Sequence, residues 1–256
     1  MTHPIVQIYE IQTPEEARKM IALGVDHIGS VVPSHQARHD PVLRETVATV
    51  RKMGGISSLI PLYSDTDEVL ETLDECRPHI VHFCDHLDPG REHGIDEALA
   101  LQEAVRRRFP DIRIMRSIPI GRPGRADGQA VLALAERLEP LSDLFLTDTV
   151  ISGTTGSGDA EQPVSGFVGI TGLTCDWDVA ADLVTRFRIP VILAGGISPE
   201  NVAAGVLQVR PFGVDSCTCT NAIDEEGRPV RFNKDPQRVE KLIAETRRAG
   251  GQGELQ

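Results

Sequence analysis

The sequence predicts an α/β protein that forms a single (β/α)₈ TIM barrel over residues 1–256. Strand-like and helix-like segments alternate eight times without a remainder, which favours a closed parallel barrel over an open doubly wound sheet. The length of 256 residues is close to the roughly 250 residues of one such barrel. No Pro- or Ser-rich linker interrupts the pattern, so one domain is expected.

Each strand-helix pair has its own local signals. The first helix shows them best, because Thr13 is a suitable cap, Pro14 takes the first helical position and Glu16 the third. The expected strands span residues 5–9, 26–32, 56–62, 79–83, 112–118, 143–147, 191–194 and 212–214. The expected helices span residues 14–23, 41–53, 65–76, 95–109, 129–138, 177–187, 200–209 and 236–248.

The stretch 189–221 contains the clearest unit. An apolar run over residues 191–194 precedes Gly195 and Gly196, and Ser198-Pro199 then opens a helix. Paired glycines at the carboxyl end of a strand let backbone N–H groups approach a ligand closely, and phosphate is the usual ligand. In a (β/α)₈ barrel the phosphate site commonly follows strands seven and eight. The alternative is that the two glycines only form a tight turn.

Composition limits the possible partners. The net charge of -12 disfavours nucleic acid, and no apolar run approaches the roughly 18 residues of a membrane span. Five scattered cysteines predict a reduced, cytoplasmic protein. Cys217 and Cys219 lack a second pair that would complete a zinc site. We therefore expect a phosphorylated small molecule as partner and no cofactor or metal, while the sequence leaves the oligomeric state open.

Chemistry in a parallel barrel lies at the carboxyl ends of the strands. The residues at these ends include Tyr9 and Glu10 after strand one, the group His82, Cys84, Asp85 and His86 around strand four, and Asp148 after strand six. The segment 148–176 is rich in Gly, Ser and Thr and lacks periodicity. We expect it to be a long flexible loop, and its length indicates a lid over the site.

The order and spacing of several motifs resemble phosphoribosylanthranilate isomerase, the (β/α)₈ enzyme of tryptophan biosynthesis, over nearly the whole chain. The matching pieces are TPEEARKMIALGVDHIGSVV, LTDT, GITGLTCDW, LAGGISPENV, GVDSCTCTN and NKDPQRVEKLI. LAGGISPENV is the most specific, because the family shows a Leu-Ala-Gly-Gly-Leu/Ile-x-Pro-x-Asn-Val turn at this place.

The resemblance implies an Amadori rearrangement, in which an N-glycoside of ribose 5-phosphate opens and becomes a 1-amino-2-ketose. A general acid protonates the ring oxygen and a general base removes the proton from C2. The resemblance places the acid on Asp148. It places phosphate binding on Gly172, on Gly195 and Gly196, and on the loop after strand eight, which contains Thr218, Cys219 and Thr220.

The chain also departs from the family pattern. The family's base is a cysteine in Lys-x-Cys-Gly, and the same place here reads Gln7-Ile8-Tyr9-Glu10. An ordinary Tyr titrates near 10, so it is a poor base at neutral pH. The family's Ser-Pro-Arg, whose arginine receives the anthranilate carboxylate, becomes SHQARHD. Arg38 takes that role if the loop folds back.

Several roles stay open on sequence alone. Tyr9 either donates a hydrogen bond to substrate or plugs the barrel mouth. His82 and Cys84 either supply a replacement base, bind a metal together with neighbouring residues, or belong to the core. Asp148 has the alternative role of capping the following turn. The leading function is an isomerase acting on a phosphorylated sugar conjugate. An epimerase or aldolase on the same barrel and a non-catalytic phosphometabolite-binding protein are the alternatives.

Overall fold

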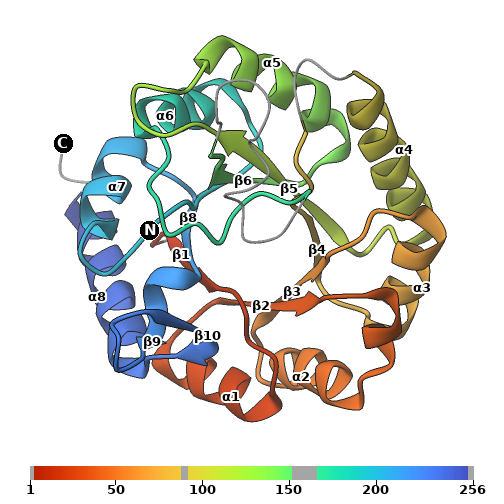
Figure 1. Cartoon of the computed structure of the whole chain (residues 1–256), viewed down its shortest axis with the longest axis horizontal. Helices are drawn as coiled ribbons and strands as arrows, with labels where there is room; N and C mark the ends of the chain where they lie inside the picture. Colours follow the sequence, from red (N-terminus) through yellow and green to blue (C-terminus); the bar gives the residue numbers. More distant parts are fainter. Residues whose placement is uncertain (1–2, 88–91, 152–165, 253–256) are drawn as a thin grey trace.

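The computed structural model describes residues 3–87, 92–151 and 166–252. Eight parallel strands close into one barrel in the order β1-β2-β3-β4-β5-β6-β7-β8. Viewed down the barrel, the helices form a ring outside the strands (Figure 1). The predicted (β/α)₈ fold is confirmed.

The elements follow one another in strict alternation around the barrel. The strands are β1 (Ile5–Ile8), β2 (His27–Val32), β3 (Ile56–Pro61), β4 (Ile80–Phe83), β5 (Arg113–Ile120), β6 (Leu144–Thr149), β7 (Val191–Leu193) and β8 (Gly213–Ser216). The helices are α1 (Pro14–Leu23), α2 (Pro41–Lys52), α3 (Thr66–Cys76), α4 (Glu92–Arg108), α5 (Gly128–Leu138), α6 (Trp177–Arg186), α7 (Val202–Val209) and α8 (Pro236–Gln252). Shorter pieces are the 3₁₀ helices η1 (His35–His39), η2 (Glu139–Leu141) and η4 (Thr218–Thr220) and the strands β9 (Asn221–Ile223) and β10 (Pro229–Lys234).

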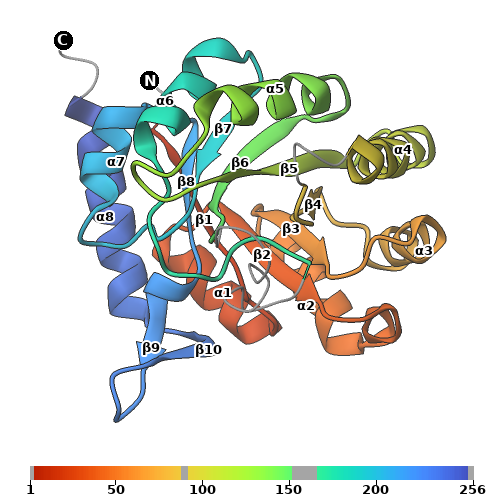
Figure 2. The same cartoon turned by 45° about the horizontal axis from the view of Figure 1, so that its top comes forward.

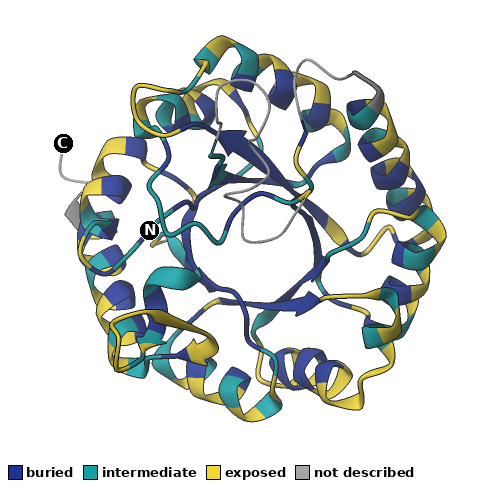
Figure 3. Ribbon diagram, viewed as in Figure 1, coloured by how far each residue is buried: buried dark blue, intermediate teal, exposed yellow. Residues whose placement is uncertain are grey.

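The barrel strands are buried on both faces, which explains why they read as nearly continuous apolar runs. All six residues of β2 are buried, for example. Figure 3 shows the buried residues on the strands and on the inner faces of the helices, with exposed residues outside. The strands thus hold their carboxyl ends in one fixed ring.

A small and a large residue complement each other inside the barrel. Tyr9 directly follows β1 and packs in the interior cluster with Ile80 and Leu146. A Cβ atom added to Gly29 of β2 would lie 2.1 Å from Cδ1 of Tyr9. Only glycine leaves room for the Tyr9 ring at this place, so the two positions together direct the ring inward.

Residues 221–234 contain an element that the sequence did not predict. Strands β9 and β10 form an antiparallel two-stranded sheet that lies beside α1 and α8 (Figures 1 and 2). All of β10 is exposed except Lys234. Because both faces of the strand meet solvent, no alternation of apolar and polar residues indicates it.

The predicted loop over residues 148–176 is described only in part, since residues 152–165 lie outside the described residues. The segment after it is held against the end of β4. Asp85 forms an antiparallel bridge with Phe167, and the N–H of Val168 donates to the carbonyl of Cys84 at 2.9 Å. This segment therefore lies over the barrel mouth. Across the described ranges, none of the helices has the length and apolar character that a membrane span requires.

Candidate active site

A chain of four hydrogen-bonded side chains crosses the barrel interior. The phenolic oxygen of Tyr9 lies 2.6 Å from Oγ of Ser58 and 2.7 Å from Nδ1 of His82, whose Nε2 lies 2.8 Å from Oγ of Ser117. Burial raises the pKa of Tyr9 well above its ordinary value and lowers the pKa of His82 to about 3. Tyr9 is therefore a neutral phenol and His82 a neutral imidazole with both nitrogens occupied.

Cys84 lies at the end of the same strand as His82, and both line one cavity, as strand alternation predicts. Burial raises the pKa of the Cys84 thiol, and the negative charges of Asp85 and Asp148 raise it further. Asp85 itself accepts two hydrogen bonds from Arg116 at 2.7 and 2.8 Å. The thiol thus stays protonated and has little basicity.

Two carboxyl groups lie at the barrel mouth, of which Asp148 is half-buried and Asp215 buried. Asp148 is the penultimate residue of β6, and desolvation raises its pKa to about 7, opposed only by a hydrogen bond from the N–H of Thr149. Asp215 of β8 has its pKa raised to about 7 by burial, while a hydrogen bond from Gln7 lowers it and the charge of Asp148 raises it. A carboxyl group with this pKa is partly protonated at neutral pH, as a general acid requires.

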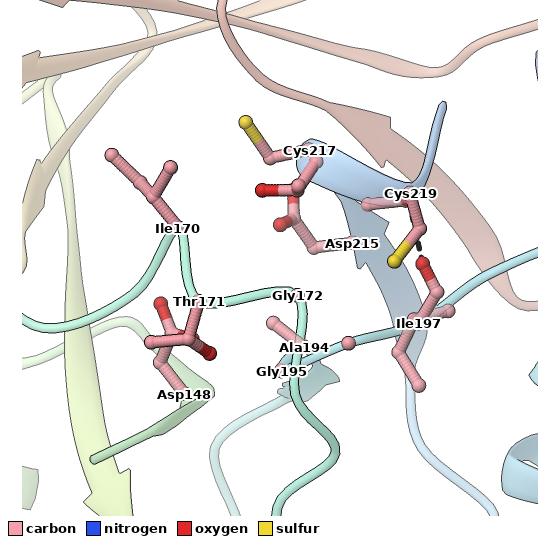
Figure 4. Close-up of a pocket in the computed structure, with 13 residues that line it drawn as sticks. Asp148, Ile170, Thr171, Gly172, Ala194, Gly195, Ile197, Asp215, Cys217 and Cys219 are labelled. Atoms are coloured by element: carbon pink, nitrogen blue, oxygen red, sulfur yellow. Dashed lines mark hydrogen bonds between the residues drawn. The ribbon is translucent and has the colours of Figure 1, made fainter. Parts of the chain in front are cut away.

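A glycine-rich cavity that is open to solvent lies beside these carboxyl groups. Figure 4 shows Thr171 on one side, Gly172 and Gly195 in the middle with Asp215 and Cys217 above them, and Cys219 and Ile197 on the other side. Gly172, Gly195 and Gly196 all have positive φ angles. Thr218 also lines the cavity, and its hydroxyl oxygen is buried without a hydrogen-bond partner among the described residues. These features suit an anion that brings its own oxygen acceptors.

Asn201 holds the glycine turn in place. Its side-chain amide donates to the carbonyl of Gly196 at 2.9 Å, and its side-chain oxygen accepts from the N–H of Ser198 at 2.9 Å. These bonds keep residues 199–201 in a turn, so α7 begins at Val202 and not at the predicted residue 200. A Cβ atom at Gly196 would lie 2.5 Å from the carbonyl carbon of Leu173, so the turn and the 172–174 segment touch directly.

A second, apolar cavity shares Asp148, Ile170, Asp215 and Cys217 with the glycine-rich cavity. Tyr9, Glu10, His82 and Cys84 also line it. The remaining lining residues are apolar or glycine: Val31, Ile60, Leu62, Leu146, Phe167, Val168 and Gly169. The site therefore has a polar end, an apolar end, and two carboxyl groups where the ends meet.

Two of the predicted binding residues are engaged elsewhere. Arg38 lies in η1, where its guanidinium donates to Glu75 at 2.9 Å and to Glu71 at 3.0 Å, both on α3. The hydroxyl of Thr220 donates back to the carbonyl of Cys217 at 3.0 Å. The contacts of Arg38 and Thr220 with substrate remain predictions, and the hydrogen bonds that these side chains make here do not support them. Among the described residues, no group of three or more His, Cys, Asp or Glu side chains is placed to hold a metal.

Relatives of known name cover almost the whole chain. No family model matches it. The N-(5'-phosphoribosyl)anthranilate isomerase of Methanopyrus kandleri is 30% identical over 243 residues, which are 94% of this chain and 98% of the relative. The chain belongs to the phosphoribosylanthranilate isomerase family. The isomerase of the same name from Methanocella arvoryzae is 27% identical over 251 residues, covering 94% and 97% of the two chains.

Solved structures of phosphoribosylanthranilate isomerases share the fold. The enzyme from Thermotoga maritima superposes with a TM-score of 0.65 at 18% identity, covering 95% of this chain and 98% of that one. The enzyme from Pyrococcus furiosus gives a TM-score of 0.65 at 20% identity, with 96% and 100% coverage. A further isomerase structure holds reduced 1-(o-carboxyphenylamino)-1-deoxyribulose 5-phosphate and gives a TM-score of 0.64 at 17% identity, with 95% and 98% coverage.

Two cations at the site, Arg231 and Lys234, were not among the site residues predicted from the sequence. Glu10 is buried and pairs with Arg231 of β10. Lys234 of β10 donates to the carbonyl of Cys217 at 2.9 Å and also bonds Asn221. The hairpin brings both cations to the site, and its exposed strand pattern gave no signal. The motif Lys-Asp-Pro, which includes Lys234, is the feature of the sequence that could have identified one of them.

Proposed function

We propose that this chain isomerises an N-(5'-phosphoribosyl) derivative of an aromatic amine to the 1-amino-1-deoxyketose 5-phosphate. Family membership supports the reaction class. The observation that supports the assignment most directly is Asp148, a half-buried carboxyl group with a pKa raised to about 7 by desolvation, at the junction of the two cavities. A group that is half protonated near neutral pH is suited to protonate the ring oxygen of the sugar.

The two cavities fit the two ends of such a substrate. The glycine-rich cavity, with Gly172, Gly195, Gly196 and the unpartnered hydroxyl of Thr218, offers donors for the phosphate. The apolar cavity, with Phe167 and its aliphatic neighbours, offers a surface for the aromatic ring. The ribose then lies between them, beside Asp148 and Asp215. Cys219 lines the phosphate end and contributes through its backbone.

Tyr9, His82 and Cys84 have supporting roles in this proposal. Their hydrogen bonds and shifted pKa values leave them uncharged at neutral pH. They close the barrel below the substrate and shape the apolar cavity. The epimerase and aldolase alternatives share the phosphate site of the barrel, and a metal held by His82, His86 and Asp148 would favour them; among the described residues no group of three or more such ligands assembles.

The test is turnover by the purified protein. N-(5'-phosphoribosyl)anthranilate and its aniline analogue are supplied, and the loss of the N-glycoside is followed with identification of the ketose product. The proposal expects conversion that Asp148→Asn reduces by roughly 10²–10⁴-fold. Absence of conversion of both conjugates by the wild type, under conditions where the protein is folded, would exclude the proposed function.

A further inference from the structure

The proposed reaction needs a group that removes the proton from C2, and the family's cysteine is replaced by Tyr9. We propose that Glu10, the next residue along the chain, is that general base. The inference rests on the proposed function, because only the isomerisation requires a base at this place. Four features of Glu10 support it: its backbone, its burial, its second carboxylate oxygen and its cation.

The backbone at Glu10 is strained. Its φ angle is 63°, in the left-handed region that side chains other than Gly, Asn and Asp rarely adopt. The family pattern has glycine at this place, and glycine adopts this conformation freely. A glutamate held there retains the turn at the end of β1 at an energetic cost. Backbone strain of this kind is concentrated at functional sites, where the role of the side chain outweighs the energetic cost of the strained backbone.

The side chain of Glu10 is buried at the site. The residue is 1% exposed and lines the apolar cavity together with Asp148, Asp215 and Cys217. Its Oε1 accepts a hydrogen bond from Nε of Arg231 at 2.7 Å. Its Oε2 is buried and meets no N–H or O–H donor among the described residues, while the thiol of Cys217 contacts the Glu10 side chain. A thiol is a weak donor, so this oxygen can exchange that contact for the proton of a substrate in the cavity.

Arg231 compensates the charge of this carboxylate. It lies on β10, so the hairpin that follows β8 brings a cation to the residue that follows β1. Strands β1 and β8 are neighbours in the barrel, with Ile8 beside Ser216. The ion pair with Arg231 holds one carboxylate oxygen of Glu10 in place. Because both oxygens belong to one planar group, the same bond also sets the direction of the other oxygen. This arrangement resembles the way a general base is held by a third group.

The neighbouring Cys217 is the competing candidate, because it also lines both cavities. Burial raises the pKa of its thiol; Lys234 opposes this shift, while Glu10 and Asp215 add to it. Nζ of Lys234 lies 3.8 Å from the sulfur but also bonds the carbonyl of Cys217 and the side chain of Asn221. The thiol is therefore protonated and is a poor proton acceptor at neutral pH.

The proton balance closes with Asp148 and Glu10 alone. Asp148 protonates the ring oxygen, the C1–O bond breaks towards oxygen, and the nitrogen lone pair forms an iminium at C1. Glu10 then takes the C2 proton, the C–H electron pair forms the C1=C2 bond, and the iminium electrons return to nitrogen. In the final tautomerisation Glu10 gives its proton to C1, the C2 hydroxyl passes its proton to Asp148, and the C1=C2 electron pair forms the new C1–H bond as the C2 carbonyl forms. Both carboxyl groups thereby return to their starting states.

The experiment compares Glu10→Gln, Glu10→Asp and Glu10→Gly with the wild type, using conjugates that carry hydrogen or deuterium at C2. Glu10→Gln is expected to lower kcat by roughly 10²–10⁴-fold with little change in KM. Glu10→Asp withdraws the carboxylate by one methylene, so the proton transfer becomes slower and the isotope effect at C2 increases. A residue with only a structural role would lower activity without changing that isotope effect.

Glu10→Gly separates catalysis from folding, because glycine relieves the strained φ angle. It is expected to remain folded, to bind reduced 1-(o-carboxyphenylamino)-1-deoxyribulose 5-phosphate, and to be inactive. Arg228→Gln in the same hairpin is the matched control, since the exposed guanidinium of Arg228 bonds Asp224 and Glu226 at the surface, and its activity should equal that of the wild type. An active wild type with an equally active Glu10→Gln overturns the assignment of Glu10 alone. Loss of activity in Cys217→Ser with full activity in Glu10→Gln transfers the role to the thiol. A wild type inactive on both conjugates overturns the proposed function itself.

Discussion

The hydroxyl of Tyr9 lies 2.7 Å from Nδ1 of His82, although β1 and β4 are not neighbours in the barrel. This bond, with those to Ser58 and Ser117, joins strands on opposite parts of the barrel wall. The position that provides a reactive thiol elsewhere in the family therefore provides a structural contact here. The consequence is that activity and stability should respond differently to changes at Tyr9.

Tyr9→Phe keeps the ring that fills the space beside Gly29 and removes only the hydroxyl. Ser58 and His82 each lose a partner in a buried place, so the free energy of unfolding should fall by about 1–3 kcal/mol. Turnover at a temperature where the variant is folded should remain close to that of the wild type. Denaturant unfolding and steady-state kinetics on the same preparation measure both quantities. Abolished turnover in a fully folded variant would return Tyr9 to the catalytic role that the sequence left open.

Activity should fall as the pH rises through about 7. Asp148 acts as an acid in its protonated form, and burial raises its pKa to about 7, so the active fraction is high below this pH and declines above it. Asp215 also has a pKa of about 7, and its pKa is raised by the charge of Asp148. The decline of activity at alkaline pH therefore reports an apparent pKa of the two carboxyl groups together. The dependence of kcat on pH measures it. An alkaline limb that persists unchanged in the residual activity of Asp148→Asn would contradict the assignment.

Stability should depend on pH through Asp215. Its pKa is raised from 3.8 to about 7 in the folded chain, so between these values the folded chain retains a proton that the unfolded chain has lost. The stabilisation from this group is fully present below about pH 4 and is lost as the pH rises through about 7. Asp215→Asn keeps the oxygen that accepts from Gln7 but cannot ionise. We compare the free energy of unfolding of Asp215→Asn with that of the wild type at each pH. This difference should be more favourable to the variant at pH 8 than at pH 4, by an amount on the order of a few kcal/mol. An identical difference between the two proteins at both pH values would contradict the raised pKa.

Thr218→Val should weaken binding of phosphorylated ligands. The buried hydroxyl without a partner is assigned to the phosphate, and a hydrogen bond to a charged group is worth enough to change the affinity by roughly 10–100-fold. Calorimetry with the reduced product analogue and with its dephosphorylated form measures the change. Thr185→Val on the exposed face of α6 is the matched control. An equal loss for both ligands would place Thr218 outside the phosphate site. Replacing Gly196 is less informative, because its side chain would collide with the backbone of Leu173 and Thr174.

The aromatic end should prefer an uncharged ring. The apolar cavity contains Glu10, Asp148 and Asp215 among apolar side chains, and Arg38 is bound to Glu71 and Glu75. A benzoate carboxylate in this place would meet acidic groups, so the aniline conjugate should have the lower KM. Arg38→Gln should leave the KM of the anthranilate conjugate unchanged and lower stability by roughly 0–1 kcal/mol. A large rise in that KM in Arg38→Gln would show that the loop does reach the substrate.

The sequence by itself determined the barrel. Eight apolar strand segments alternate with eight amphipathic helices, and a closed parallel barrel is the arrangement in which all eight pairs have a place. The sequence also located Asp148 and the glycine turn, since both follow directly from strand ends. It could not determine the hairpin over residues 221–234, whose β10 is exposed except for Lys234 and so has no burial pattern. Nor could it show that Arg38 is held by α3.

Only the tertiary structure decided which of the candidate side chains have the protonation and the hydrogen bonding that catalysis requires. Tyr9, His82 and Cys84 stand at strand ends just as Asp148 and Glu10 do, and nothing in their spacing separates them. Closure of the barrel joins Tyr9 to His82 and Ser58. The hairpin places Arg231 on one oxygen of Glu10, and the other oxygen meets no N–H or O–H donor in the part of the chain that the structure describes. Burial then gives Asp148 a pKa of about 7. Protonation and hydrogen bonding depend on contacts between residues distant in the chain, and for that reason local sequence patterns do not contain them.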